Sequence, residues 1–287
     1  MTAEKALLFF VIIAVASYLY GNVNNAVIIS KFLGRDVRKE GSGNPGTLNM
    51  SRTFGIKIGA LVLLLDILKG VVPTLVASLV FGNAVFEGST LGVGECARYI
   101  AGFFVVLGHV FPVIYKFKGG KGIASTIGFM AVCNWWFTLI CGVLAIAFIL
   151  LTKLGAIGSF IATVPPIIYN FVVILVSYGQ MVVPALYFFI AAEVCLVLTF
   201  FLIIYAHRTN IKRLVNGNEN KTDWSGMIKK IFSKKKENEV QSETEHNSVD
   251  TAADTAGNTA AVNNATDNTA DTAADTAVTT DDTTKKQ

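Results

Sequence analysis

The sequence predicts an all-α integral membrane protein, a polytopic bundle of about seven transmembrane helices. Of its 287 residues, 53% are hydrophobic and 15% are charged, with a mean hydropathy of +0.55. Soluble domains carry about 25% charged residues, so this chain is too apolar to be one. Apolar runs near the length of about 20 residues that a membrane helix needs recur as far as residue 206.

The predicted helices follow these runs in chain order: 5–30, 56–82, 97–116, 123–134, 136–152, 155–176 and 182–206. The stretch 123–152 allows two interpretations, one long helix or two short helices that turn at Asn134. If it is split, the piece 123–134 is short for a membrane crossing. It would then have to be tilted, re-entrant or protected by neighbouring helices.

Basic residues decide between these interpretations, because Lys and Arg mark cytoplasmic loops. The loop 83–95 contains two acids and no base, which places it outside. The three basic loops share the cytoplasmic side only if an even number of helices lies between 122 and 207, so the split is favoured. We expect the N-terminus outside and the C-terminus inside. The basic residues of the three loops are Lys31, Arg35, Arg38, Lys39 and Arg52; Lys116, Lys118 and Lys121; and Arg208, Lys212 and Arg213.

The chain divides into three parts. Residues 1–220 form the membrane domain, and its first run is not expected to be cleaved, although Ala14-Val15-Ala16 imitates a signal-peptide site, because apolar character continues beyond it. Residues 221–239 are basic, with apolar residues at helical spacing. They are either an amphipathic helix on anionic lipid or a solvated tail. Residues 240–287, acidic and rich in Thr, Ala, Asp and Asn, are predicted to be disordered.

Composition excludes several function classes. The four cysteines show no CxxC pair and no His/Cys ligand spacing, so we predict neither a disulfide frame nor a metal site. No cofactor is predicted. The net charge of +4 reflects basic loops and an acidic end, with no face suited to nucleic acid.

The first of three polar motifs is GSGNPGTLNMSRTFG, residues 41–55. Its glycines permit positive φ angles and close approach to a ligand. Ser42, Asn44 and Asn49 offer hydrogen-bond donors, and Arg52 offers a cation. A plain turn explains the Gly and Pro residues, but not this density of donors.

The second motif, GHVFPVIYKFKGGKG at 108–122, brackets Gly119 and Gly120 with lysines and opens a helix after Gly122. A lysine beside helix N-terminal amides is typical of a phosphate site. It is not a nucleotide-binding Walker A loop, because glycine follows Lys121 where that motif has Ser or Thr. His109 is interpreted as structural.

The third motif, HRTNIKRLVNGNE at 207–219, places His207 and Asn210 on one helical face. Its cations also suit a helix C-terminus without any ligand. Within the second predicted helix, Asp66 and Lys69 are three residues apart. We expect each to pair with the other or with a neighbour, as structural support, with handling of protons or substrate as the alternative.

Together the motifs resemble the bacterial acyl-phosphate-dependent glycerol-3-phosphate acyltransferases of the PlsY type, over roughly residues 5–220. This resemblance implies a multi-pass enzyme of the bacterial plasma membrane with a cytoplasmic active site. It would transfer an acyl group from acyl phosphate to the 1-hydroxyl of glycerol 3-phosphate, giving lysophosphatidate and phosphate. It implies coupling to the soluble enzyme that forms acyl phosphate, and surrounding membrane lipid as a further partner.

The resemblance also implies residue roles. The residues that would hold the phosphates and neutralise charge at the carbonyl are Ser42, Arg52, Lys121, His207 and Asn210. The residues that would shape the substrate site are Gly43, Asn44, Asn49, Gly119, Gly120 and Glu219. One departure is that the family's Ala-Thr-Asn is Thr47-Leu48-Asn49 here, so Thr47 receives no role.

Two questions stay open at this point. The base for the attacking hydroxyl is either His207 or the leaving phosphate, and the resemblance favours the phosphate. The alternative functions are a transporter for a phosphorylated solute and, resting on the tail alone, an interaction scaffold. A transporter is expected to carry charged residues on both sides of the membrane, whereas the predicted outer loops carry almost none.

Overall fold

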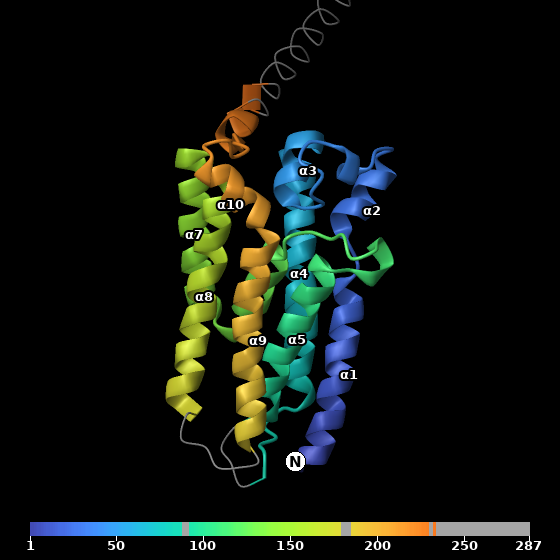
Figure 1. Cartoon of the computed structure of the whole chain (residues 1–287), viewed down its shortest axis with the longest axis vertical. Helices are drawn as coiled ribbons and strands as arrows, with labels where there is room; N and C mark the ends of the chain where they lie inside the picture. The colour runs from blue at the N-terminus through green and yellow to red at the C-terminus, as the bar shows by residue number, and fades with distance from the viewer. Residues whose placement is uncertain (88–91, 179–184, 230–231, 234–287) are drawn as a thin grey trace, which may run out of the picture. The chain divides into compact units, whose positions relative to one another are not determined.

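The computed structural model describes residues 1–87, 92–178, 185–229 and 232–233. Residues 1–227 form one compact unit, and a second unit begins at Ile228. The described residues contain no β-strand, which confirms the all-α prediction (Figure 1). The helices are α1 (Ala3–Gly21), α2 (Asn25–Phe32), η1 (Val37–Lys39), α3 (Thr47–Phe54), α4 (Ile56–Val80), α5 (Val93–Val110), η2 (Val113–Tyr115), α6 (Ile123–Cys133), α7 (Trp135–Thr152), α8 (Gly155–Tyr178), α9 (Ala185–Ala206) and α10 (Arg208–Val215).

Six segments of the described chain are long and apolar enough to cross a membrane. The seventh apolar helix, α6, has only 11 residues. Asn134 separates it from α7, as predicted, because its side chain accepts a hydrogen bond from the Phe137 amide at 3.3 Å and so caps α7. Which end of the bundle faces the cytoplasm remains the prediction made from the basic loops.

Two predicted helices end differently from expectation. The run 5–30 is broken into α1 and α2, and Asn24 caps α2 by accepting a hydrogen bond from Val27 N at 3.0 Å. The run 97–116 ends at Val110, because Pro112 disfavours a helical conformation at Phe111. The residues after Val110 are thereby freed to form the loop of the second motif.

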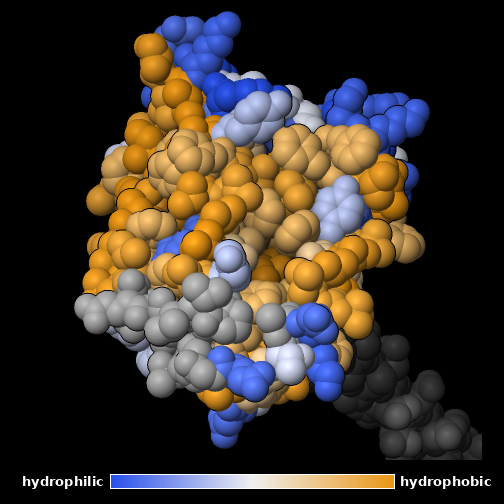
Figure 2. All heavy atoms as spheres, turned by 60° about the horizontal axis from the view of Figure 1, so that its bottom comes forward, coloured by the Kyte–Doolittle hydropathy of each residue, from blue (hydrophilic) through white to orange (hydrophobic). Residues whose placement is uncertain are grey.

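Helix α5 is the most buried of the spans, and it packs against α1, α4, α6 and α9. Small residues allow the helices to approach closely. A side chain at Gly21 of α1 would overlap the Val105 carbonyl of α5, and one at Gly128 of α6 would overlap a carbonyl of α4. Figure 2, which turns the bottom of Figure 1 toward the viewer, shows a mostly hydrophobic surface with hydrophilic residues mainly toward its edges.

The first and third motifs lie at the end of the bundle opposite the N-terminus, where α3 and α10 lie, and the loop of the second motif lies nearer to the middle of the bundle (Figure 1). Both are short helices that the apolar pattern does not predict. Of the basic segment 221–239, the structure describes 221–229 and 232–233, with 224–229 helical. Its placement on lipid stays a prediction. The tail 240–287 lies outside the described residues.

Candidate active site

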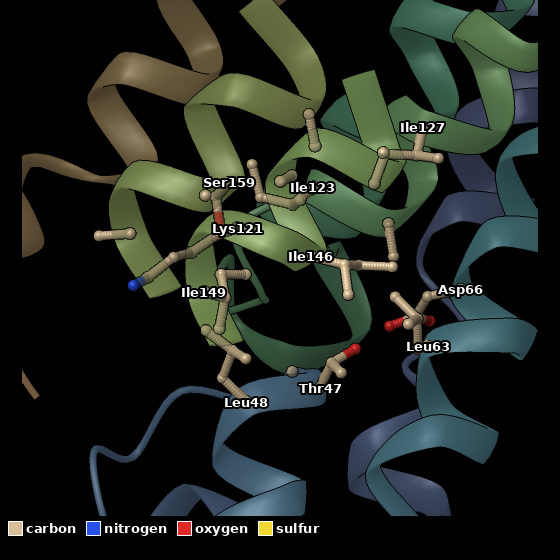
Figure 3. Close-up of a pocket in the computed structure, with 18 of the residues that line it drawn as sticks. Thr47, Leu48, Leu63, Asp66, Lys121, Ile123, Ile127, Ile146, Ile149 and Ser159 are labelled. Carbon is tan, nitrogen blue, oxygen red and sulfur yellow. The ribbon is translucent and has the colours of Figure 1, made fainter. Parts of the chain in front are cut away.

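A cavity of about 520 Å³ joins the three motifs. Its apolar wall comes from α4, α6, α7 and α8, and Figure 3 shows Ile146 between Lys121 on one side and Asp66 on the other. Its polar wall is formed by Ser42, Asn44, Asn49, Arg52, Lys121, His207, Asn210 and Arg213. Such a space suits a molecule with an anionic head and an apolar chain.

In the first motif, Asn49 organises the loop from a buried position. Its Nδ2 donates to the carbonyl oxygens of Val37 at 3.2 Å and Glu40 at 2.9 Å, and its Oδ1 accepts from the Ser42 amide at 3.0 Å. Gly41 and Gly43 have φ values of +54° and +70°, which favour glycine. These contacts fix Ser42 and Asn44 at the cavity wall. Thr47 also lines the cavity.

In the second motif, the two glycines fold back on the end of α5. The Gly119 amide donates to Val110 O at 3.2 Å, and the Gly120 amide donates to His109 O at 3.1 Å. A side chain at Gly119 would overlap the His109 carbonyl. These two amides therefore complete hydrogen bonds to the end of α5, and of the motif's three lysines Lys121 lines the cavity, together with His109 and Gly122.

In the third motif, Asn210 links two charged residues. Its Oδ1 accepts a hydrogen bond from Lys121, and its Nδ2 donates to Glu219 Oε1 at 2.6 Å. Glu219 also accepts from Arg213 Nε at 3.2 Å. His207 is buried against the Phe160 ring, and its Nδ1 lies 3.0 Å from Ile203 O. Because a carbonyl only accepts, Nδ1 carries the proton and Nε2 has a free lone pair.

Burial and like charges perturb this polar end. Burial, reinforced by the charges of Arg213 and Arg52, lowers the pKa of Lys121 to about 8, despite the opposing effect of Glu219. Burial and the nearby Lys121 lower the pKa of His207 to about 4, so His207 is neutral at pH 7. Burial also lowers the pKa of Arg52. Three cations thus surround one carboxylate, an arrangement that favours an anionic ligand.

A family model described as glycerol-3-phosphate acyltransferase matches residues 11–217. The chain belongs to the glycerol-3-phosphate acyltransferase family. It is 37% identical over 214 residues to the glycerol-3-phosphate acyltransferase of Clostridioides difficile strain 630, covering 74% of this chain and 95% of that protein. It is 31% identical over 233 residues to the one from Mycoplasma mobile, covering 77% and 95%.

Two solved structures share the fold. The crystal structure of PlsY, an integral membrane glycerol 3-phosphate acyltransferase, in its glycerol 3-phosphate form matches with a TM-score of 0.59 and 31% identity. Its lysophosphatidic acid form matches with a TM-score of 0.58 and 29% identity. Each match covers 74% of this chain and 94% of the other. The prediction of an acyltransferase of the PlsY type in a multi-pass membrane fold is thereby confirmed.

The structure separates the predicted site residues into three groups. Ser42, Arg52, Lys121, His207 and Asn210 all line the large cavity, together with Asn44 and Asn49. Gly43 and Gly119 instead line a smaller cavity of about 390 Å³ beside Arg38, Lys116 and Lys118. Gly120 and Glu219 line neither cavity, and Glu219 accepts hydrogen bonds from Asn210 and Arg213.

Sequence reasoning missed part of the cavity wall. Ser159 of α8 lines it, as do Asn220 and Trp224 beyond the family match. His109, interpreted from sequence as structural only, also lines the cavity. None of the first three stands in a motif. His109 carried a signal, since it lies ten residues before Gly119 in the same Gly-rich stretch.

Proposed function

We propose that the protein transfers a fatty acyl group from acyl phosphate to the 1-hydroxyl of glycerol 3-phosphate. The products are 1-acylglycerol 3-phosphate and inorganic phosphate. The observation that carries this proposal is the single cavity in which a cationic end meets an apolar wall between helices. The similar PlsY structures, in glycerol 3-phosphate and lysophosphatidic acid forms, support the same pair of ligands for this site.

In the proposed reaction, the glycerol hydroxyl oxygen attacks the acyl carbonyl carbon. The bond from that carbon to the phosphate oxygen then breaks, and the phosphate leaves with the hydroxyl proton. Arg52 and Lys121 hold the phosphate groups, and Ser42, His207 and Asn210 position them by hydrogen bonds. The same cations stabilise the negative charge that develops on the carbonyl oxygen. The Asn49 and Glu219 contacts fix these side chains in place.

The state of His207 bears on which group takes the proton. Its Nε2 lone pair is free to accept a hydrogen bond from the glycerol hydroxyl. With a pKa of about 4, however, His207 is a weak base at neutral pH. A phosphate with a second pKa of about 6 is the stronger proton acceptor. We therefore assign proton removal to the leaving phosphate and orientation of the hydroxyl to His207.

The same site supports a proposal for the acyl donor and for the compartment. An acyl phosphate supplies its own leaving group and offers a second anion to the cationic end, whereas the cavity shows no feature for a nucleotide. We propose that the site faces the bacterial cytoplasm, where a soluble enzyme forms acyl phosphate. The acyl chain enters between helices from the surrounding lipid.

The test uses full-length protein in liposomes with labelled glycerol 3-phosphate, and with palmitoyl phosphate or palmitoyl-CoA supplied separately. We expect labelled lysophosphatidate from palmitoyl phosphate alone, and its loss in Lys121→Ala. Lys153→Ala is the matched control, because Lys153 pairs with Asp223 on the surface and does not line the cavity. Product from palmitoyl-CoA would contradict the donor. Label accumulating inside vesicles without product would support the transporter alternative.

A further inference from the structure

Three polar side chains lie buried beside the active-site cavity, within membrane-spanning helices. Asp66 and Lys69 belong to α4, and His109 belongs to α5; their exposed fractions are 2%, 3% and 4%. The pairing expected for Asp66 and Lys69 is confirmed, with 3.4 Å between Nζ and Oδ1. Asp66 and His109 line the cavity. Ionisable groups inside a membrane span mark functional positions by default, so this cluster calls for an explanation.

Lys69 lies at the centre of the cluster. Its Nζ is 2.6 Å from Val23 O and 2.8 Å from His109 Nδ1. Carbonyl and carboxylate oxygens only accept hydrogen bonds, so the ammonium protons of Lys69 are directed at them and at Nδ1. Nδ1 is therefore the acceptor, and the ring proton of His109 is on Nε2. Asp66, which also accepts from Asn25 Nδ2 at 2.8 Å, stabilises the ammonium.

The other edge of the His109 ring meets the loop that carries Lys121. A side chain at Gly120 would overlap Nε2, so the ring lies directly against the Gly120 backbone. The Gly120 amide also donates to the carbonyl of His109 at 3.1 Å. His109 is thus held on one edge by Lys69 and supports, with its other edge, the residue that precedes Lys121.

We propose that the Lys69–His109 pair is a positioning element that sets the place of the Lys121 ammonium in the active site. Asp66 holds Lys69 as an ammonium, Lys69 fixes the His109 ring, and the ring fixes Gly120. This inference rests on the proposed function, because it gives Lys121 the task of holding substrate phosphate. A purely structural cluster would instead join α1, α4 and α5 with no effect on substrate.

Two substitutions at His109 separate these roles. His109→Asn places an amide oxygen near the position of Nδ1, so Lys69 keeps an acceptor while the support for Gly120 is lost. We expect the unfolding temperature in detergent to stay near that of the wild type. We expect the KM for glycerol 3-phosphate to rise about tenfold, because a displaced Lys121 ammonium holds the substrate phosphate less well. His109→Gln, which fills the space of Nε2 but withdraws the acceptor, should lower the unfolding temperature more.

A second variant covers the case in which the His109 variants fail to fold. Gly120→Ala introduces a methyl group against Nε2 and displaces the loop from the opposite side, without touching Lys69. It should reproduce the rise in KM for glycerol 3-phosphate. A wild-type KM in Gly120→Ala would overturn the proposal.

The decisive measurement is a double-mutant cycle with Lys121→Ala. If His109 acts through Lys121, His109→Asn adds less than twofold to the loss of kcat/KM already caused by Lys121→Ala. Full multiplication of the two effects would overturn the proposal. The same cycle, measured on binding of labelled glycerol 3-phosphate, separates the positioning role from the proposed acyl-transfer reaction. Non-additive binding without any acyl transfer would leave the positioning role standing while the proposed reaction fails.

Discussion

The contact between Arg52 and Thr222 gives the sharpest single test of the site. Thr222 lies beyond the family match, which ends at residue 217, and its side chain is fully buried. Its Oγ1 accepts a hydrogen bond from Arg52 Nη1 at 2.8 Å, and its amide donates to Lys153 O at 2.8 Å. The segment after α10 therefore reaches a predicted phosphate-binding residue. Thr222→Val removes the hydroxyl and keeps the shape of the side chain.

The expected size of the effect follows from this geometry. A hydrogen bond to a charged group contributes about 1.5–3 kcal/mol. The lower end applies here, because Arg52 is only half-buried and water can replace part of the lost contact. A loss of about 1.4 kcal/mol corresponds to a factor of about ten. We therefore expect kcat/KM for glycerol 3-phosphate to fall about tenfold in Thr222→Val.

The assay varies glycerol 3-phosphate at saturating palmitoyl phosphate in liposomes. Thr222→Ser keeps the hydroxyl and should stay within about twofold of the wild type. Lys153→Met breaks only an exposed ion pair with Asp223 and leaves the Lys153 carbonyl in place, so its kcat/KM should also stay near that of the wild type. Equal kcat/KM values for Thr222→Val and Thr222→Ser would refute the reasoning.

Three further predictions concern other parts of the chain. Because the pKa of Lys121 is lowered to about 8, kcat/KM for glycerol 3-phosphate should fall as pH rises through 8 and the ammonium loses its proton. A pH–rate profile that stays flat to about pH 9.5 would contradict this. Deletion of 240–287 should leave liposome activity intact, and a loss would count against a merely solvated tail. Glu219→Ala should lower kcat/KM by about ten- to a hundredfold, since Asn210 and Arg213 lose their acceptor, whereas Glu219→Gln keeps one acceptor and should cost less.

The membrane helices could be predicted from the sequence because hydrocarbon imposes a strict rule on composition and length. The run 56–82 is α4 (Ile56–Val80), and 136–152 is α7 (Trp135–Thr152). The break between α1 and α2 was missed, although Asn22, Asn24 and Asn25 carry the signal: an Asn before a helical run is a common cap.

Long-range contacts could not be predicted in the same way. His109 and Lys69 are forty residues apart, and no spacing rule states that α4 and α5 bring them within 2.8 Å. The same holds for Thr222 and Arg52, which are 170 residues apart. Most of the cationic residues that line the cavity could be predicted from the polar motifs. Cationic side chains are costly near lipid and are therefore rarely found there without a function. The residues that hold those cations in position have ordinary types, and only the fold identifies them.

The shortness of α6 bears on how one cavity could meet both proposed substrates. Its 11 residues span only about 17 Å, against a hydrocarbon thickness of about 30 Å. Figure 1 shows the loop that precedes α6 below the level of α3, nearer to the middle of the bundle. Burial in the protein lowers the pKa of Lys121, and the cavity brings this cation beside the apolar wall. A full-length α6 would leave Lys121 at the surface, where it could bind a phosphate but not beside an acyl carbonyl.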